Sequence, residues 1–321
     1  VDVSPINGIT SYIMNNGDML NKGFSISLNG YPVKTKNFRW YMSTYYSVNL
    51  NKVQTDDARN YNLNDYLNGT AVVSGQPIST FYSYKFLGLN PQNGAPMFDD
   101  WEDRWHLLQG KTLDEVVPMI LVNSGTRDPK FSGDLNNTFT YKNWSLSLNF
   151  SYSLGSKVRL FEMYGPIING ISAAANVREE FLDRWQVPGD EKYTVYPSII
   201  SPSSPDYEHY RLHYSAPQRA VGPNSGVPAF ANNVWQMYDD SDLRVVSGNY
   251  LKLQSLSFSY RLNDRLLRKT PFTQLSISFN THNCFTISAK ELRGQDPSQA
   301  GFADAGLSIR PSYTIGLNVS F

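Results

Sequence analysis

The sequence predicts an all-β protein, part of an antiparallel transmembrane β-barrel with long extracellular loops. Apolar and small polar residues alternate with period two over stretches of about ten residues, as in strands whose two faces meet different surroundings. The connections between these stretches are either short or very long, which is typical of outer-membrane barrels. Charged residues make up 17% of the 321 residues and aromatic residues 14%. Soluble domains contain roughly 25% charged residues.

The clearest alternation lies at the end of the chain. From Ile309 to Phe321 apolar residues occupy the odd positions and polar residues the even ones, with one break at Pro311. The aromatic residues gather near the ends of such stretches, where barrels carry aromatic girdles at the two lipid interfaces. The pattern predicts strands at Phe24–Leu28, Asn37–Asn49, Phe131–Tyr141, Trp144–Leu154, Asn249–Leu262, Phe272–Thr281 and Ser308–Phe321. Whether Ser79–Leu89 adds one more hairpin is open from the sequence.

The connections fall into two classes. The short ones are Gly30–Asn37, Lys142–Asn143 and Asn263–Pro271, and the long ones are Asn51–Lys130, Phe161–Gly248 and Asn283–Leu307. If Phe321 lies on the periplasmic side, the alternation of strand directions places every long connection on the extracellular side. A soluble β-sandwich would also alternate, but its strands usually run to about five or six residues.

About seven strands are too few to close a barrel with a wide lumen. They would leave two raw sheet edges, which lipid does not tolerate. The chain also begins at Val1, without Met or a signal peptide. We therefore expect a fragment, whose missing wall comes from residues before Val1 or from another chain.

Composition and motifs exclude several classes of function. The 28 basic and 28 acidic residues leave no basic excess, so no nucleic-acid partner is expected. Cys284 is the only cysteine, which excludes an internal disulfide and a cysteine-based metal cluster. No run of about 20 apolar residues occurs, which excludes a transmembrane helix but not a spanning strand. Nucleotide-binding and hydrolase motifs are absent, so we expect neither an enzyme nor a cofactor.

Two clusters resemble metal ligands. Asp99, Asp100, Glu102 and Asp103 lie together but lack the spacing of a calcium loop, so a solvated loop is the favoured interpretation. His209 and His213 have the spacing that faces one side of a helix, but a third ligand is missing and the flanking Tyr and Pro suit a loop. We therefore predict no metal site.

The longest connection carries the candidate recognition residues. Tyr and Trp offer rigid area with a polar tip, which suits protein contacts or stacking on sugar rings. The alternative, that these side chains only pack the loop on itself, stays open. The candidates for binding a partner or ligand are Trp185, Tyr193, Tyr196, Tyr207, Tyr210, Tyr214 and Trp235.

Several phrases, in family order over nearly the whole chain, resemble the C-terminal third of SusC/RagA-like TonB-dependent transporters. Each is weak alone, and together they are specific. They are Asn21-Lys22-Gly23-Phe24, Asn37-Phe38-Arg39-Trp40, Asn49-Leu50-Asn51-Lys52-Val53, Gly75-Gln76-Pro77-Ile78, Phe81 to Pro91, Asp128-Pro129-Lys130-Phe131, Tyr141-Lys142-Asn143-Trp144, Arg184-Trp185, Pro188-Gly189-Asp190-Glu191, Asn249-Tyr250-Leu251-Lys252-Leu253 and Tyr313 to Phe321.

The resemblance implies a 22-stranded outer-membrane barrel with a plug in its lumen, of which residues 1–321 form the C-terminal portion. It also implies a TonB box and a SusD-like surface lipoprotein that lids the extracellular mouth. The plug and the TonB box are not found in this sequence. The expected function is TonB-dependent import of oligosaccharides or peptides. The alternatives are a passive porin-like or adhesin barrel and a soluble secreted β-sandwich binding module.

Overall fold

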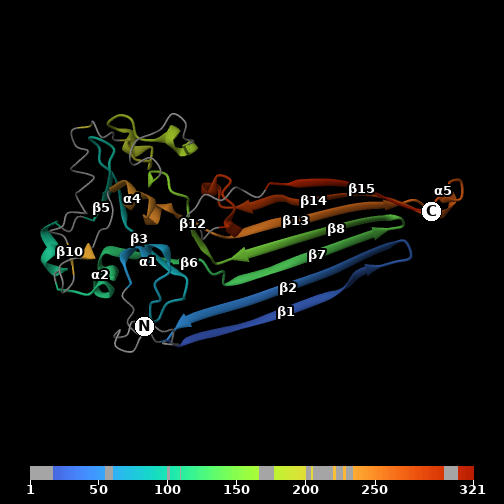
Figure 1. Cartoon of the computed structure of the whole chain (residues 1–321), viewed down its shortest axis with the longest axis horizontal. Helices are drawn as coiled ribbons and strands as arrows, with labels where there is room; N and C mark the ends of the chain where they lie inside the picture. The colour runs from blue at the N-terminus through green and yellow to red at the C-terminus, as the bar shows by residue number, and fades with distance from the viewer. Residues whose placement is uncertain are drawn as a thin grey trace, which may run out of the picture.

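One antiparallel sheet of seven strands dominates the computed structural model, which describes residues 17–54, 61–99, 102–108, 110–165, 177–199, 204, 220–221, 227–228, 234–299 and 310–321. Each strand pairs with the next one along the chain that belongs to the sheet (Figure 1). In spatial order the strands are β1 (Met19–Lys34), β2 (Phe38–Val53), β7 (Phe131–Tyr141), β8 (Trp144–Leu154), β13 (Tyr250–Arg261), β14 (Gln274–Ser288) and β15 (Ser312–Ser320).

The prediction of an all-β, antiparallel chain is confirmed, and each of the seven strands falls on a stretch predicted from alternation. The first strand is the least complete prediction, because β1 covers 16 residues where alternation indicated only Phe24–Leu28. The described strands form an open sheet whose edges are β1 and β15. Closure into a barrel, and the count of 22 strands, stay predictions.

The pairing register gives the sheet one apolar and one polar face. Since successive side chains on a strand point to opposite faces, residues paired across the strands share a face. One row across the sheet is apolar and consists of Trp40, Phe139, Leu146, Phe258, Phe279 and Ile315. A row on the other face is polar and consists of Ser43, Asn136, Asn149, Ser255, His282 and Ser312.

Aromatic side chains meet near both ends of the apolar face. Near the short turns, the rings of Trp40 and Phe139 stack with centroids 5.7 Å apart. The rings of Trp144 and Tyr260, at the same end, lie 4.2 Å apart. Near the other end the ring of Phe131 stacks on the ring of Tyr46 in the neighbouring strand β2, with a centroid distance of 6.2 Å. These contacts follow the pattern of two aromatic girdles.

The short and long connections leave opposite ends of the sheet, as predicted. Residues 35–37, 142–143 and 262–273 form the turns at the end where the C-terminus lies (Figure 1). Residues 54–130, 155–249 and 289–311 connect the strands at the other end. We call the described parts of these three connections the loop assembly. Which side of a membrane it faces stays a prediction.

The loop assembly has short elements of its own. Its strands pair as β3 (Thr80–Tyr84) with β6 (Leu121–Thr126), β4 (Phe86–Leu89) with β5 (Pro96–Phe98), β9 (Lys157–Arg159) with β12 (Val245–Ser247), and β10 (Ala220–Val221) with β11 (Val227–Pro228). Its α-helices are α1 (Leu63–Asn68), α2 (Leu113–Ile120) and α4 (Val234–Asp239), whereas α5 (Asp264–Leu267) lies in a turn at the other end of the sheet. Its 3₁₀ turns are Glu102–Leu107, Glu179–Asp183, Asp190–Lys192, Asp242–Arg244, Lys290–Leu292 and Pro297–Gln299. Within the described ranges no helix is long and apolar enough to cross a membrane.

The segment Ser79–Leu89, whose role the sequence left open, belongs to the loop assembly and not to the large sheet. Its strands β3 and β4 pair with β6 and β5 in two separate small sheets. All five residues of β3 are buried, whereas a strand with one face on lipid would bury at most every second residue in the protein. Burial on both faces therefore assigns this segment to a packed core.

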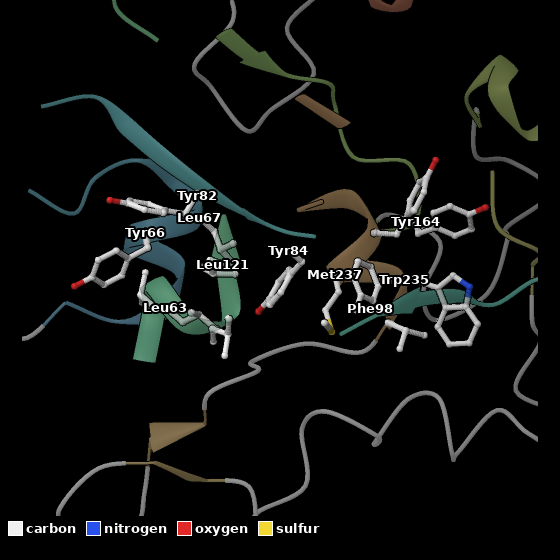
Figure 2. Close-up of a cluster of buried hydrophobic side chains, with 14 of the residues drawn as sticks. Leu63, Tyr66, Leu67, Tyr82, Tyr84, Phe98, Leu121, Tyr164, Trp235 and Met237 are labelled. Carbon is white, nitrogen blue, oxygen red and sulfur yellow. The ribbon is translucent and has the colours of Figure 1, made fainter. Parts of the chain in front are cut away.

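The largest cluster of buried apolar side chains in the described residues lies in the loop assembly (Figure 2). It includes Leu67, Tyr84 and Tyr238, each at most 1% exposed. On the sheet, by contrast, large apolar side chains stay accessible, such as Ile315 at 80% and Leu317 at 66%. A continuous apolar face of this kind needs lipid or another protein surface to cover it.

Candidate functional site

Buried polar contacts hold the loop assembly together around Arg159. Its Nη2 donates to the carbonyl oxygen of Tyr82 at 2.8 Å and to Ser83 Oγ at 3.1 Å. Its Nε lies 3.8 Å from Asp240 Oδ1. Arginine is suited to this position because its planar group presents five N–H donors in different directions. This side chain, from the second long connection, thus fastens β3 of the first.

Asp239, at the end of α4, accepts three backbone hydrogen bonds. Its carboxylate oxygens receive the amides of Met163, Tyr164 and Gly165, each at 2.8 Å. Burial raises the pKa of Asp239 to about 6, against the opposing effect of the nearby Arg244 guanidinium. Asp239 therefore ties the chain that follows β9 to α4.

The Tyr164 hydroxyl links this core to the segment that holds the recognition candidates. It donates to the carbonyl oxygen of Pro197. Burial raises the pKa of Tyr164 well above its usual value, so the hydroxyl keeps its proton and remains a donor. The segment of residues 177–199 is thereby fixed to the core on the side of α4.

The structure divides the seven candidate recognition residues. Trp235 is 4% exposed and belongs to the core, where its Nε1 donates to the Ser198 carbonyl oxygen at 3.2 Å (Figure 2). Tyr196 packs against the same core. Tyr193 is 91% exposed. Tyr207, Tyr210 and Tyr214 lie outside the described residues.

Trp185 is 7% exposed and lies between two parts of the loop assembly. Its backbone amide donates to the Tyr196 carbonyl oxygen at 2.9 Å, and its Nε1 donates to Glu191 Oε2 at 3.3 Å. Its ring lies against the backbone of Gly94, so closely that a Cβ atom there would be 2.4 Å from the ring carbon Cδ2. Trp185 is therefore held on two sides, and it also lines a pocket.

This pocket has a volume of about 430 Å³ and lies between the loop that follows β4 and residues 184–199. Its walls combine amide groups, one guanidinium, hydroxyls and two apolar side chains. The lining residues are Gln92, Asn93, Arg184, Trp185, Gln186, Ser198, Ile199 and Ser204. Volumes of about 300–1,000 Å³ are usual for small-ligand sites. We call this site the Arg184 pocket.

Six exposed apolar side chains lie on the same segment. A group of such side chains on one short segment suits a protein contact, because solvated loops rarely gather them. We call it the 177–199 patch, and its members are Val177, Leu182, Val187, Tyr193, Val195 and Ile199. Leu182 at 73% and Tyr193 at 91% are the most exposed.

The pocket residues other than Trp185 were not among the predicted candidates. Gln92, Asn93 and Ser198 carry no sequence signal, because they come together only when the first and second long connections pack. Arg184 precedes Trp185 directly, and that pair was visible in the sequence. An aromatic beside a guanidinium was the signal that could have extended the prediction.

The two clusters that resemble metal ligands, the acidic residues at 99–103 and the histidines at 209 and 213, are only partly described by the structure. Asp99 forms an ion pair with Arg104 at 2.5 Å. Asp100, His209 and His213 lie outside the described residues. In the part of the chain that the structure describes, no three His, Cys, Asp or Glu side chains are grouped as a metal site requires.

The chain is similar in sequence to TonB-dependent receptors of Formosa agariphila, and no family model matches it. Receptor P3 is 23% identical over 98% of this chain and 30% of its own length. Receptor P39 is 21% identical over 98% of this chain and 31% of its own length. The chain thus spans under a third of these curated relatives.

Two solved structures share the fold. The RagAB peptide transporter matches with a TM-score of 0.64 and 18% identity, over 100% of this chain and 31% of the transporter chain. The RagAB peptide importer in its closed-closed state matches with a TM-score of 0.64 and 18% identity, over 100% and 32%. The predicted resemblance to SusC/RagA-like TonB-dependent transporters is confirmed. The relatives are receptors, in agreement with the prediction that the chain is not an enzyme.

Proposed function

We propose that this chain, which resembles SusC/RagA-like TonB-dependent transporters in sequence and fold, supplies part of the wall and mouth of an outer-membrane nutrient importer. The observation that carries the proposal is the arrangement of one long sheet. Its apolar face suits lipid, its polar face suits a lumen, and every long connection leaves the same end. The protein imports oligosaccharides or peptides in a TonB-dependent manner.

The two edges of the sheet need partners. Edge strands present unpaired backbone groups, which are not stable in lipid unless another strand pairs with them. Leu28 on β1 is 60% exposed and Ile315 on β15 is 80% exposed, so the apolar face continues to both edges. We therefore assign residues 1–321 to the C-terminal portion of a 22-stranded barrel. The plug and the TonB box belong to other parts of the protein.

A SusD-like lipoprotein is the partner that we assign to the loop assembly. Leu182 and Tyr193 on the 177–199 patch offer apolar and aromatic area suited to a protein contact. Trp235 lies in the buried core and Tyr196 packs against it, so we assign these two a supporting role and not direct contact. Trp185, on the same segment, lines the Arg184 pocket. The role of Tyr207, Tyr210 and Tyr214 in binding remains a prediction from the sequence.

The import proposal is tested in cells by the uptake of labelled oligosaccharides and peptides, measured for the full protein with and without tonB. We expect uptake that disappears in the tonB deletion strain. Uptake that persists there would favour the first alternative, a passive porin-like barrel. The second alternative, a soluble β-sandwich module, predicts a protein that stays soluble without detergent. We expect extraction from the outer membrane to need detergent.

The lid contact is tested by Leu182→Asp and Tyr193→Ala, with Leu266→Asp as the control. Leu266 is also exposed, at 46%, but lies in α5 at the opposite end of the sheet. We expect the first two variants to weaken co-purification of the lipoprotein and the control to leave it unchanged. A deletion of residues 201–226 that leaves lid capture and uptake intact would argue against a role for the middle of the loop.

A further inference from the structure

We propose that the Arg184 pocket binds a carboxylate group of the cargo, so that the loop assembly selects acidic oligomers before they reach the lumen. This inference rests on the proposed import function and adds to it the chemical class of the cargo. It is carried by three features of the pocket: the guanidinium of Arg184, the hydroxyl of Ser198, and the lack of an acidic side chain among the described residues that line it.

Arg184 has no carboxylate partner among the described residues. Its Nη1 donates to the Phe181 carbonyl oxygen at 2.8 Å, which leaves most of its N–H groups for a ligand. Neighbouring arginines differ in this respect. Arg178 pairs with Glu180 at 2.6 Å, and Arg293 pairs with Asp183 at 3.5 Å. Within residues 177–199, Arg184 is thus the arginine that has no ion pair with a described carboxylate, and it lines the pocket.

The nearby carboxylates that could have paired with Arg184 are already engaged. Asp190 accepts the backbone amides of Gln186 and Val187, at 2.9 and 3.0 Å. Glu191 accepts the amide of Gly189 at 2.8 Å and the Trp185 indole N–H at 3.3 Å. These bonds keep the two carboxylates in the turn, so a ligand supplies the anion that Arg184 lacks.

Ser198 offers a second polar group. Its Oγ is buried, and the described residues provide no hydrogen-bond partner for it. The backbone of Ser198 is fixed on both sides, because its amide donates to the Gly94 carbonyl oxygen at 2.9 Å and its carbonyl oxygen accepts from Trp235 Nε1 at 3.2 Å. Buried hydroxyls are nearly always paired. A ligand oxygen in the pocket would satisfy this one.

The remaining described lining indicates what surrounds the carboxylate. Gln92, Asn93 and Gln186 carry amide groups, which can bind hydroxyls or peptide groups, and Trp185 and Ile199 add apolar area. The pocket volume of about 430 Å³ accepts one or two units of an oligomer and not a whole chain. Both a peptide C-terminus and a uronic acid unit present a carboxylate of this kind.

The test uses the full-length protein in detergent and isothermal titration with two matched pairs of probes. The peptide pair is tetra-alanine with a free C-terminal carboxylate and the same peptide as its C-terminal amide. The sugar pair is trigalacturonic acid and its methyl ester. We expect the free acid of at least one pair to bind at least about tenfold more tightly than its neutral form, the loss expected for one charge-assisted pair. The pair that responds identifies the source of the carboxylate.

Arg184→Gln should reduce affinity for the acid to that of the neutral probe, while Arg184→Lys should retain part of it. Arg268→Gln is the control, because Arg268 is an exposed arginine beside α5 at the other end of the sheet. Unchanged exchange protection of the Trp185 amide in each variant shows that the fold is kept. Equal affinity for acid and neutral forms, or full affinity in Arg184→Gln, overturns the pocket proposal. TonB-dependent uptake that persists alongside either result would leave the import function standing.

Discussion

Replacing Gly94 with alanine is expected to detach the Trp185 segment from the rest of the loop assembly. Gly94 has a φ of +71°, in the left-handed region that favours glycine. A Cβ atom there would lie 2.4 to 2.6 Å from Cδ2, Cε3 and Cγ of Trp185. The substitution therefore adds backbone strain and a steric overlap with the Trp185 ring. The ring cannot move away freely, because Trp185 donates hydrogen bonds to Tyr196 and Glu191.

The two contributions are separable with a control. An alanine in the left-handed region costs about 1–2 kcal/mol, and overpacking a well-packed site costs about 1–3 kcal/mol. Gly94→Ala should therefore destabilise the segment by about 2–5 kcal/mol in total. Gly75 has a φ of +83°, and no atom lies within 4 Å of the position that an alanine methyl group would take there, so Gly75→Ala carries the backbone strain alone. We expect about 1–2 kcal/mol for that control.

Hydrogen–deuterium exchange of detergent-solubilised protein measures the effect. The amides to follow are those of Trp185 and Ser198, which donate to the carbonyl oxygens of Tyr196 and Gly94, each at 2.9 Å. Each 1.4 kcal/mol lowers protection about tenfold, so Gly94→Ala should lower it by at least about 30-fold. The reasoning is wrong if Gly94→Ala lowers the protection of these amides by no more than Gly75→Ala lowers the protection of amides near Gly75. The contact between Gly94 and Trp185 would then contribute nothing to stability.

Three further outcomes are expected. On β15, Ile315→Lys should lower folding stability in lipid vesicles by about 2–4 kcal/mol near the bilayer centre, whereas Thr314→Lys on the polar face should have little effect; equal urea midpoints would contradict the assignment of the faces. Burial raises the pKa values of Asp239 and Asp240 to about 6, so the folded loop assembly favours their protonated forms. The free energy of unfolding of the loop assembly should therefore increase as the pH falls from about 7.5 to about 5, because this stabilisation is lost when the pH rises through about 6. Hydrogen–deuterium exchange, corrected for the intrinsic exchange rates, measures the change. Lower protection at the acidic pH would refute the prediction. Arg159→Met should leave Asp240 without its ion-pair partner and the Tyr82 carbonyl oxygen without its donor, and should destabilise the loop assembly by about 3–5 kcal/mol. Limited proteolysis should then cleave the loops while the sheet stays intact.

The large sheet was predictable because its information is local. Alternation between two faces appears in consecutive residues, and the length of a connection is read directly from the chain. The limits of β1 were harder to predict, because Asn21, Lys22 and Gly23 break the alternation while the strand continues by pairing with Asn51, Leu50 and Asn49. Pairing with a neighbouring strand, and not side-chain pattern, sets that end.

The candidate site was predictable only in part. The aromatic content of the longest connection was visible, but burial of Trp235 and exposure of Tyr193 depend on which loops pack together. Ser83 on β3 illustrates the same limit. It is fully buried beside Arg159, which lies 76 residues further along the chain. Contacts at such separations leave no periodic signal in the sequence.

Residue periodicity and the spacing of the turns were enough to predict the seven long strands, apart from the limits of β1, together with their two faces and the shared end from which the long connections leave. Only the tertiary structure decided that Ser79–Leu89 joins a packed loop assembly, that Asp239 holds the chain after β9, and that Arg184 and Ser198 meet Trp185 around a pocket. These features arise where separate connections pack against each other. Burial, hydrogen bonding and unmatched charge then depend on partners that are distant in the chain.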